Sequence, residues 1–334
     1  MPDNIRLSLV MEKSPVNAVA VLEASRPLAT IDELIDRAKD LGRASKSSST
    51  RTAYASDWRD FTGWCTAHAL QSLPATPQTV ALYVTDLGGR AAVATVCRRL
   101  VTISVTHKEG DLDSPTAHKL VREVLSGLKR TRGTAQRKKT ALTSDLMKAV
   151  LLEVGADSLK AKRDRAILLV GLTGALRRSE IAALDVTDLR FQKEGVVVLI
   201  RRSKTDQVGV GAEVAMRANP VAGLCVVRAL REWIATAGIT EGPLFRTFAL
   251  NGGGLHDRRI AGQDVARIVR RVTQRAGLEG DFAGHSLRAG FVTSAARQGV
   301  AEASIMNVSR HKSVAILRGY VRRANLFEGI PVLS

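Results

Sequence analysis

A stretch of twelve residues, 129–140, divides this chain into two parts of different character. It carries six basic side chains and no acidic one, and it shows no apolar periodicity. A segment without an apolar face has nothing to bury in a core, so it indicates a linker between domains. A length of 334 residues favours two domains. The linker is either a solvated charge run or a segment that lies on a DNA backbone, and the charge of the whole chain favours the second.

The part before the linker is expected to be a small all-helical domain over residues 47–128. Between Tyr54 and Cys65, aromatic and apolar residues recur at helical spacing, which indicates a core stripe rather than a base-stacking surface. Residues 1–46 have weak periodicity apart from a short predicted helix at 30–35, and we expect this N-terminal extension to be partly disordered. Three further helices are predicted, beginning near Pro77, Ala91 and Ser114.

The part after the linker is predicted to be rich in helix with a small β-sheet. Residues 196–200 form a β-branched run, residues 203–207 a polar turn, and residues 208–216 an alternating return strand. This is the only strand pair that the pattern predicts, so the fold class is mainly α with a small sheet. The predicted helices of this part cover residues 143–151, 164–172, 221–237, 262–276, 286–298, 301–308 and 314–320.

The balance of charge indicates a polyanionic partner. Lys and Arg total 50 against 32 Asp and Glu, a formal net charge of +18. Such a surface suits nucleic acid, because each neutralised phosphate releases counterions. A basic membrane-surface protein is the competing class, but neither a long basic amphipathic helix nor an apolar anchor is visible. No apolar run is long enough to span a membrane, and the first residues lack the order of a secretory signal. We therefore expect no membrane partner.

The three cysteines, Cys65, Cys97 and Cys225, lie far apart without CxxC spacing. That spacing excludes a thiolate zinc site and a disulfide framework, and a reducing cytoplasm fits. The acidic residues form no carboxylate cluster of the kind that metal-dependent nucleases use. No phosphate-cradling G-x-x-x-x-G-K-[ST] loop is present. We expect neither a metal nor another cofactor.

The most informative residues are His285, Arg288, His311 and Tyr320, which fall within 36 residues of a chain that has only six His and three Tyr. Arginine clamps a phosphate, histidine moves a proton near neutral pH, and tyrosine can form a covalent intermediate. Such a set can act on a phosphodiester without a metal. Each residue alone also has an ordinary structural explanation. Tyr320, for example, could be an aromatic side chain of an amphipathic helix that packs on the core.

In combination with residues upstream, these motifs resemble the tyrosine recombinase (phage integrase) family, and within it the Cre-like members. The resemblance extends from about Ser47 to Ala324 and rests on residues 176–181, a lysine in the β turn, residues 284–288, His311 and Tyr320. It implies a two-domain DNA clamp. An N-terminal helical (SAM-like) core-binding domain, 47–128, would be joined to an α+β catalytic domain, 141–334, which ends in a C-terminal tail.

The resemblance also implies the roles of single residues. Tyr320 would attack the scissile phosphate, leaving a 3′-phosphotyrosine and a free 5′-hydroxyl. Arg177 and Arg288 would hold the non-bridging oxygens, and Lys204 would be the general acid. His285 and His311 would donate hydrogen bonds and manage the tyrosine proton, and Glu180 would orient a neighbour in the site. The register of residues 176–181 favours Arg177 over Arg178. Ser309 and Arg310 precede His311 where the family often has Leu-Gly, which predicts altered packing around that ring.

DNA contacts are predicted for ten basic residues: Arg98, Arg99, Lys129, Arg130, Arg132, Arg137, Lys138, Lys139, Arg201 and Arg202. The implied function is site-specific recombination through a Holliday junction, without metal or ATP. The implied assembly is a homotetramer on two double-stranded DNA sites, built from protomers that are monomeric or weakly associated when free. The host would be a bacterium, a phage or a mobile element, and the protein would lie in the cytoplasm with the nucleoid.

Two other classes stay open at this point. A type IB topoisomerase shares the chemistry and would relax DNA as a monomer without a defined site. A non-catalytic DNA-binding protein could keep the fold, although the complete set of six residues argues against it. The apolar C-terminal tail, 325–333, either docks on its own domain or is exchanged with a neighbouring protomer.

Overall fold

The computed structural model describes residues 30–134, 139–155, 157–202, 206, 210–249, 254–311 and 313–324. Two compact units are present, one up to Ala135 and the other from Gln136 onward. The boundary falls inside the basic segment 129–140. Each unit is described here by itself, and the C-terminal tail and most of residues 1–46 lie outside the described residues.

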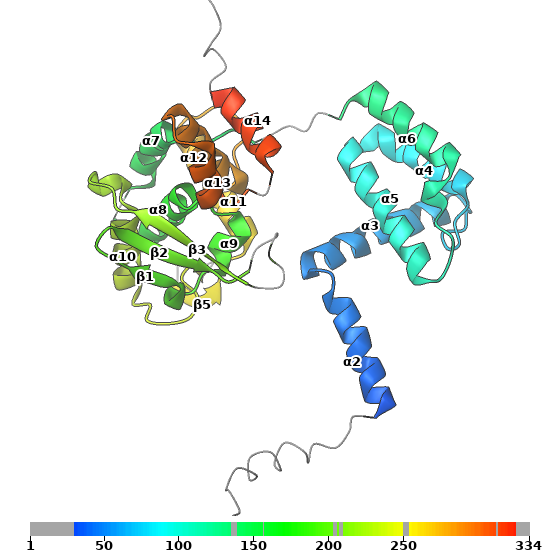
Figure 1. Ribbon diagram of the computed structural model, residues 1–334, viewed down its shortest axis with the longest axis horizontal. Coiled ribbons are helices and arrows are strands. Elements are labelled where there is room, and N and C mark those ends of the chain that lie inside the picture. Colours follow the sequence, from blue (N-terminus) through cyan, green and yellow to red (C-terminus); the bar gives the residue numbers. More distant parts are fainter. Residues whose placement is uncertain are drawn as a thin grey trace, which may run out of the picture. The chain divides into compact units, whose positions relative to one another are not determined.

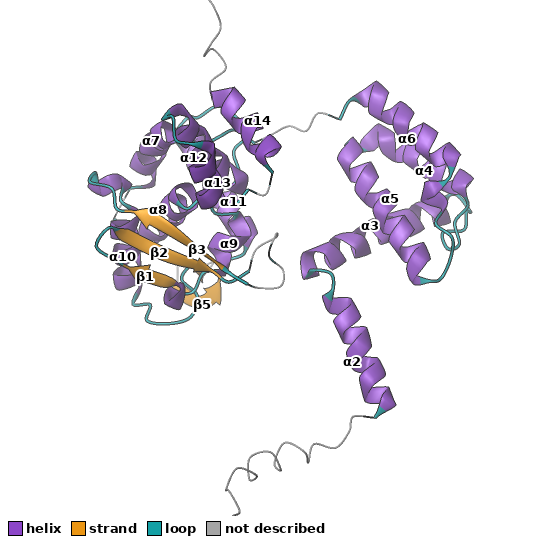
Figure 2. Cartoon of the chain, in the orientation of Figure 1, coloured by secondary structure: helices purple, strands orange, loops and turns teal. Residues whose placement is uncertain are grey.

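The first unit is helical (Figures 1 and 2). Within it α4 packs along α6 and α3 along α5, so the apolar faces of four helices meet. Their shared core includes the fully buried Phe61, Tyr83 and Leu87, which are largely the aromatic and apolar residues that recur at helical spacing. The elements of this unit are α2 (Ile31–Ala44), α3 (Ser48–Ala67), α4 (Pro77–Arg90), α5 (Val93–Glu109), the 3₁₀ turn η2 (Pro115–Ala117) and α6 (Lys119–Arg132).

Local capping explains where these helices begin and end. The Thr30 hydroxyl accepts from the backbone N–H of Glu33, and the Glu33 carboxylate accepts from that of Thr30, a complete capping box that carries α2 well beyond the short helix predicted at 30–35. At the other end of the unit, α6 runs four residues past the predicted limit of 128, because no glycine or proline lies between Leu128 and Gly133. Gly133 has φ +71°, a conformation that favours glycine.

The second unit contains helices and two small antiparallel sheets. Its helices are α7 (Ser144–Val154), α8 (Leu159–Thr173), α9 (Arg178–Ala183), α10 (Val226–Ala237), α11 (Gly262–Arg275), α12 (Gly284–Arg297), α13 (Glu302–Ser309) and α14 (Val314–Ala324). Two 3₁₀ turns are present as well: η3 (Val186–Asp188) follows α9, and η4 (Ala222–Leu224) precedes α10. The strands are β1 (Leu189–Phe191), β2 (Gly195–Ile200), β3 (Ala212–Arg217), β4 (Arg246–Phe248) and β5 (Leu255–Arg259).

Helix α8 organises this unit, because it contacts α10 and β3 as well as α12 (Figure 1). Its ten buried residues include the unbroken run from Ala166 to Leu172, so the second half of the helix is apolar on every side. Close packing requires glycine at one crossing: a Cβ on Gly290 of α12 would lie 1.8 Å from the carbonyl oxygen of Leu142. The site described below is built on the α12 side of α8, where α12 packs against α14.

The prediction of a single strand pair is wrong in two respects. The pair β2–β3 forms, but β1 adds a third strand through β2, and β4 pairs with β5 in a separate sheet. Strand β1, Leu-Arg-Phe, is too short for its alternation to be recognised as a strand, and β5 reads Leu-His-Asp-Arg-Arg, which has no alternating apolar pattern. Their stability comes from pairing with a partner strand, which a local pattern does not reveal.

Among the described residues, no helix combines the length and the apolar character needed to cross a membrane. In the same part of the chain, no group of three or more His, Cys, Asp or Glu side chains could hold a metal ion.

Candidate active site

The first component of the site is the start of α9. Arg177 is the N-cap residue, and its backbone N–H donates to Glu180 Oε2 at 2.9 Å. Its guanidinium Nη1 donates to the other oxygen, Oε1, at 2.6 Å. The Glu180 side chain is only 1% exposed. A single buried carboxylate therefore fixes both the backbone and the side chain of Arg177.

The second component is the first turn of α12, which carries His285 and Arg288. Arg288 is 2% exposed, and its Nη1 donates to the carbonyl oxygen of Ala175 at 2.8 Å. Ala175 has φ +48°, so this carbonyl belongs to a turn held in the left-handed region. Arg288 Nη2 is buried and has no hydrogen-bond acceptor among the described residues. The loop before α9 and the start of α12 thus hold Arg177 and Arg288 in one site.

The third component is the end of α13. The Ser309 hydroxyl donates to the carbonyl oxygen of Ile305 at 2.6 Å and lies 2.8 Å from His311 Nδ1. Because the hydroxyl proton is already used, Nδ1 of His311 must carry the proton of this second bond. In the neutral ring, Nε2 is then left as an acceptor. Ser309 thus selects the tautomer of His311.

Arg310, between these two residues, also enters the site. Its Nη2 donates to Glu180 Oε2 at 2.6 Å, so one carboxylate binds two guanidinium groups. Sequence reasoning did not place Arg310 among the site residues. The available signal was its position directly before His311, where the family often has glycine, but that position alone does not tell in which direction the side chain points.

Tyr320 completes the arrangement from α14. Its hydroxyl oxygen lies 2.7 Å from His285 Nε2, and its ring centroid lies 6.2 Å from that of His311. Tyr320 also packs against the apolar cluster of α12, α13 and α14 that contains Val292, Ile305 and Leu317. Tyr320 therefore packs on the apolar cluster with its ring and at the same time approaches two histidines.

Burial and repulsion shift the pKa values of these groups. The pKa of His311 is lowered to about 4 by burial and by the positive charges of Arg288 and Arg177. The pKa of His285 is lowered by the same causes. Burial, together with Arg177, lowers the pKa of Arg288 to about 10, which still leaves it charged at neutral pH. Both histidines are accordingly neutral at pH 7, in a site whose arginines are charged.

The structure thus brings five of the six predicted catalytic residues together: Arg177, His285, Arg288, His311 and Tyr320, with Glu180 beside them. Lys204, the predicted general acid, lies outside the described residues, as do Arg137 and Lys138.

The basic residues predicted to contact DNA differ in whether they already form hydrogen bonds or ion pairs within the protein. Arg98 donates two hydrogen bonds of 2.8 Å to the buried Asp57, while half of its side chain stays exposed. Arg99 is largely buried and donates to Asp60 and to the Tyr83 hydroxyl. Arg99 is therefore part of the internal packing of the helical unit. The same network raises the pKa of Tyr83, first by burial and then through Asp60.

The other predicted contacts that the structure describes are exposed or partly exposed. Lys129, Arg130 and Arg202 are exposed, and Arg132 donates to the carbonyl of Gly88. Lys139 is paired with Asp281 at 2.6 Å. Arg201 donates to Asp188 at 2.7 Å, with 53% of its side chain exposed.

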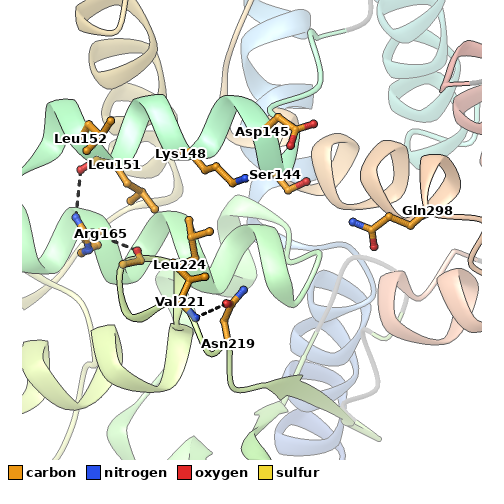
Figure 3. Close-up of a pocket in the computed structure, with 11 residues that line it drawn as sticks. Ser144, Asp145, Lys148, Leu151, Leu152, Arg165, Asn219, Val221, Leu224 and Gln298 are labelled. Carbon is orange, nitrogen blue, oxygen red and sulfur yellow. Dashed lines mark hydrogen bonds between the residues drawn. The ribbon is translucent and has the colours of Figure 1, made fainter.

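A separate cavity of about 680 Å³ lies between α7 and the η4 turn (Figure 3). Leu151, Leu152, Val221 and Leu224 supply its apolar lining, and Arg165 bridges the carbonyl oxygens of Leu151 and Gly223. None of the arginines, histidines or tyrosine of the site above lines it. The chemistry-bearing residues therefore do not belong to this cavity.

Comparison with protein families gives a match to the model of the phage integrase family over residues 141–326. Among curated proteins, an integrase/recombinase xerD homolog of Selenomonas ruminantium is 37% identical over 87% of this chain and 86% of its own length. A tyrosine recombinase of Synechococcus elongatus is 26% identical over 93% of this chain and 96% of its own length.

Two solved structures share the fold at low identity. A lambda integrase dimer bound to a COC′ core site matches with a TM-score of 0.59 and 15% identity, covering 97% of this chain and 84% of the other. The XerH recombinase in a post-cleavage complex with a palindromic difH substrate matches with a TM-score of 0.54 and 16% identity, covering 76% and 69%.

Proposed function

The chain belongs to the phage integrase family of tyrosine recombinases, and we propose that it uses Tyr320 to cut and rejoin double-stranded DNA at specific sites. The observation that carries this proposal is the 2.7 Å contact between the Tyr320 hydroxyl and His285 Nε2, in a site that also holds Arg177 and Arg288. A nucleophile within hydrogen-bond reach of a proton carrier is the arrangement that covalent catalysis needs.

In the proposed reaction, the Tyr320 oxygen attacks the scissile phosphorus and the bond from phosphorus to the 5′ oxygen breaks. The tyrosine proton passes to His285, which is neutral at pH 7 and can accept it. The departing 5′ oxygen takes a proton, for which we propose Lys204 as the donor. The phosphotyrosine keeps the energy of the broken bond, so a 5′-hydroxyl of the partner strand can reverse the step without ATP.

Arg177 and Arg288 are proposed to hold the non-bridging oxygens. The buried Nη2 of Arg288 already lacks an acceptor, and a phosphate oxygen would supply one after local adjustment. Negative charge gathers on these oxygens in the transition state, where fixed guanidinium groups stabilise it most. Glu180 keeps Arg177 in place through two hydrogen bonds.

We propose that the helical unit and the segment 129–140 bind the DNA backbone through exposed residues such as Lys129 and Arg130, and that the exposed Arg202 of the second unit binds it as well. The domain limits 47–128, 129–140 and 141–334 and the contacts of Arg137 and Lys138 belong to this proposal. So do the homotetramer on two sites, the Holliday-junction intermediate, exchange of the C-terminal tail between protomers, and action in the cytoplasm at the nucleoid. The similar lambda integrase is bound to a core site and XerH to a difH substrate, which supports a DNA partner.

The decisive experiment uses a nicked suicide DNA site taken from the sequence that flanks the gene. Wild-type protein is expected to form a covalent protein–DNA adduct that Tyr320→Phe cannot form, while Tyr54→Phe in the helical unit behaves as wild type. An adduct that persists in Tyr320→Phe would refute the nucleophile. Relaxation of a supercoiled plasmid that lacks the site would instead favour the topoisomerase, and binding without any adduct would favour a non-catalytic protein.

A further inference from the structure

Arg310 is a largely buried arginine at a backbone position that favours glycine. It follows α13 with φ +54° and ψ +41°, the left-handed conformation, which is strained for a residue with a Cβ. Its side chain is only 14% exposed. The backbone of Arg310 is strained and its charged side chain is largely removed from water. Both costs need a compensating interaction inside the protein.

That interaction is with the carboxylate that also holds Arg177. Glu180 Oε2 accepts from Arg310 Nη2 and from the backbone N–H of Arg177, while Oε1 accepts from Arg177 Nη1. Glu180 thereby ties the end of α13 to the start of α9. His311 directly follows Arg310, so the hydrogen bond between Arg310 and Glu180 also fixes the position of the backbone at His311.

The charges around Glu180 do not balance in the free protein. Among the described residues, Arg177, Arg288 and Arg310 carry three positive charges, and Glu180 is the one carboxylate that acts on the pKa values of Arg288 and Arg310. Three buried guanidinium nitrogens, Arg288 Nη2 and Arg310 Nε and Nη1, also have no acceptor in this part of the chain. Excess positive charge and unused donors at one place both indicate a site that is completed by an anion.

We propose that Arg310 is a positioning residue for strand cleavage, which holds Glu180 and Arg177 in register and supplies the third positive charge of the phosphate site. This inference rests on the proposed function. The transition state of phosphoryl transfer to Tyr320 carries more negative charge than the bound diester, so the third guanidinium stabilises it more than the ground state.

Arg310 also acts on the histidine beside it. The titratable groups that act on or contact His311 are Arg288 and His285 on α12, Arg177 at the start of α9, Arg310 at the end of α13, and Tyr320 on α14. The positive charge of Arg310 is one of the causes that lower the pKa of His311. Removing that charge is therefore expected to move the His311 titration toward its ordinary range, an effect that a purely structural cap on α13 would not have.

The test compares Arg310→Gly with Arg310→Lys. Glycine relieves the left-handed backbone, so folding is not expected to suffer from strain. Single-turnover cleavage of the suicide site is expected to fall by about 100-fold in Arg310→Gly, the size typical of losing one preorganised donor. Arg310→Lys keeps the charge but not the planar fork, and is expected to recover part of the rate.

A matched backbone control is Asp111→Gly, an exposed position in the helical unit that also has positive φ, 53°. It is expected to leave cleavage unchanged. If Arg310→Gly should unfold, Arg310→Gln removes the charge while keeping the length of the side chain.

The second readout is the pKa of His311, followed by NMR of histidine-labelled protein without DNA. It is expected to rise in Arg310→Gly and Arg310→Gln and to stay low in Arg310→Lys. Wild-type cleavage rates together with an unmoved His311 titration in the Gly variant would overturn the proposal. Absence of any adduct with wild-type protein would instead refute the proposed function, and the NMR measurement would still decide on Arg310.

Discussion

The hydroxyl oxygen of Tyr320 lies 2.7 Å from Nε2 of His285 in the same chain. Tyr320 reaches this place because α14 packs on α12, the helix that carries His285 in its first turn. The structure therefore assembles the proposed nucleophile, Tyr320, and the arginines proposed to bind the phosphate within one protomer.

This arrangement predicts cleavage in cis. A mixture of Tyr320→Phe with Arg288→Ala protein is expected to yield no covalent adduct on a suicide site, because each protomer lacks one part of its own site. The measurement is denaturing gel electrophoresis of labelled DNA after mixing. Recovery of the adduct in the mixture would show that one protomer donates its tyrosine to another.

Glu180 is predicted to matter for stability as well as for cleavage. Glu180→Gln leaves the buried guanidinium groups of Arg177 and Arg310 without their anion, which typically costs about 3–5 kcal/mol when a buried pair loses one partner. Chemical denaturation of wild type and variant measures the loss. The matched control is Glu302→Gln, which breaks the exposed pair with Arg318 and is expected to cost less than about 1 kcal/mol. Equal losses in the two variants would contradict the central position of Glu180.

The lowered pKa of His311 predicts a loss of stability in mild acid. Its pKa is about 4 in the folded chain against an ordinary value of 6.5, so the unfolded chain binds the extra proton first. The contribution of His311 to the free energy of unfolding is therefore fully present above pH 6.5 and is lost as the pH falls toward 4. Denaturation midpoints between pH 7 and pH 4.5 test this. His311→Asn should show a weaker dependence in that window, and an unchanged slope would speak against a depressed pKa.

Close packing of α12 predicts that Gly290 cannot carry a side chain. A Cβ there would meet the backbone of Leu142, and overpacking of this kind costs about 1–3 kcal/mol or more. Gly290→Ala is expected to lower the denaturation midpoint. Gly63→Ala in α3, where nothing lies within 4 Å, should raise it slightly through helix propensity. A Gly290→Ala protein as stable as wild type would mean that α12 can shift away from Leu142.

The exposed end of α6 predicts a salt-dependent contribution to DNA binding. Removing one cationic side chain from a phosphate reduces the slope of log K against log salt by about 0.9. Lys129→Ala and Arg130→Ala should therefore each weaken binding at low salt and flatten the slope. Lys119→Ala, at the other end of the same helix and 3.7 Å from Glu123, is the control. Salt slopes equal to that of the wild type in all three variants would exclude α6 from the DNA interface.

Much of the architecture is visible in the local pattern of the chain. Helix α11 follows from its apolar periodicity and the second half of α8 from its apolar run, because both are local patterns. The residue types Arg177, His285, Arg288, His311 and Tyr320 and their order along the chain indicate phosphoryl-transfer chemistry, although Arg177 lies far from the others in the sequence. The strands β1 and β5 escape such reasoning, since three residues or a polar run become strands only by pairing with a partner.

The tertiary structure alone decided which basic residues serve the interior and which serve the site. Arg99 looks like a surface cation in the sequence, yet it is largely buried with Asp60 and Tyr83. Arg310 looks like an ordinary helix-end residue, yet the left-handed turn that follows α13 directs it to Glu180, 130 residues earlier. The physical reason is the same in both cases: the partner of a charge is chosen by proximity in space, and the sequence specifies that proximity only through the complete fold.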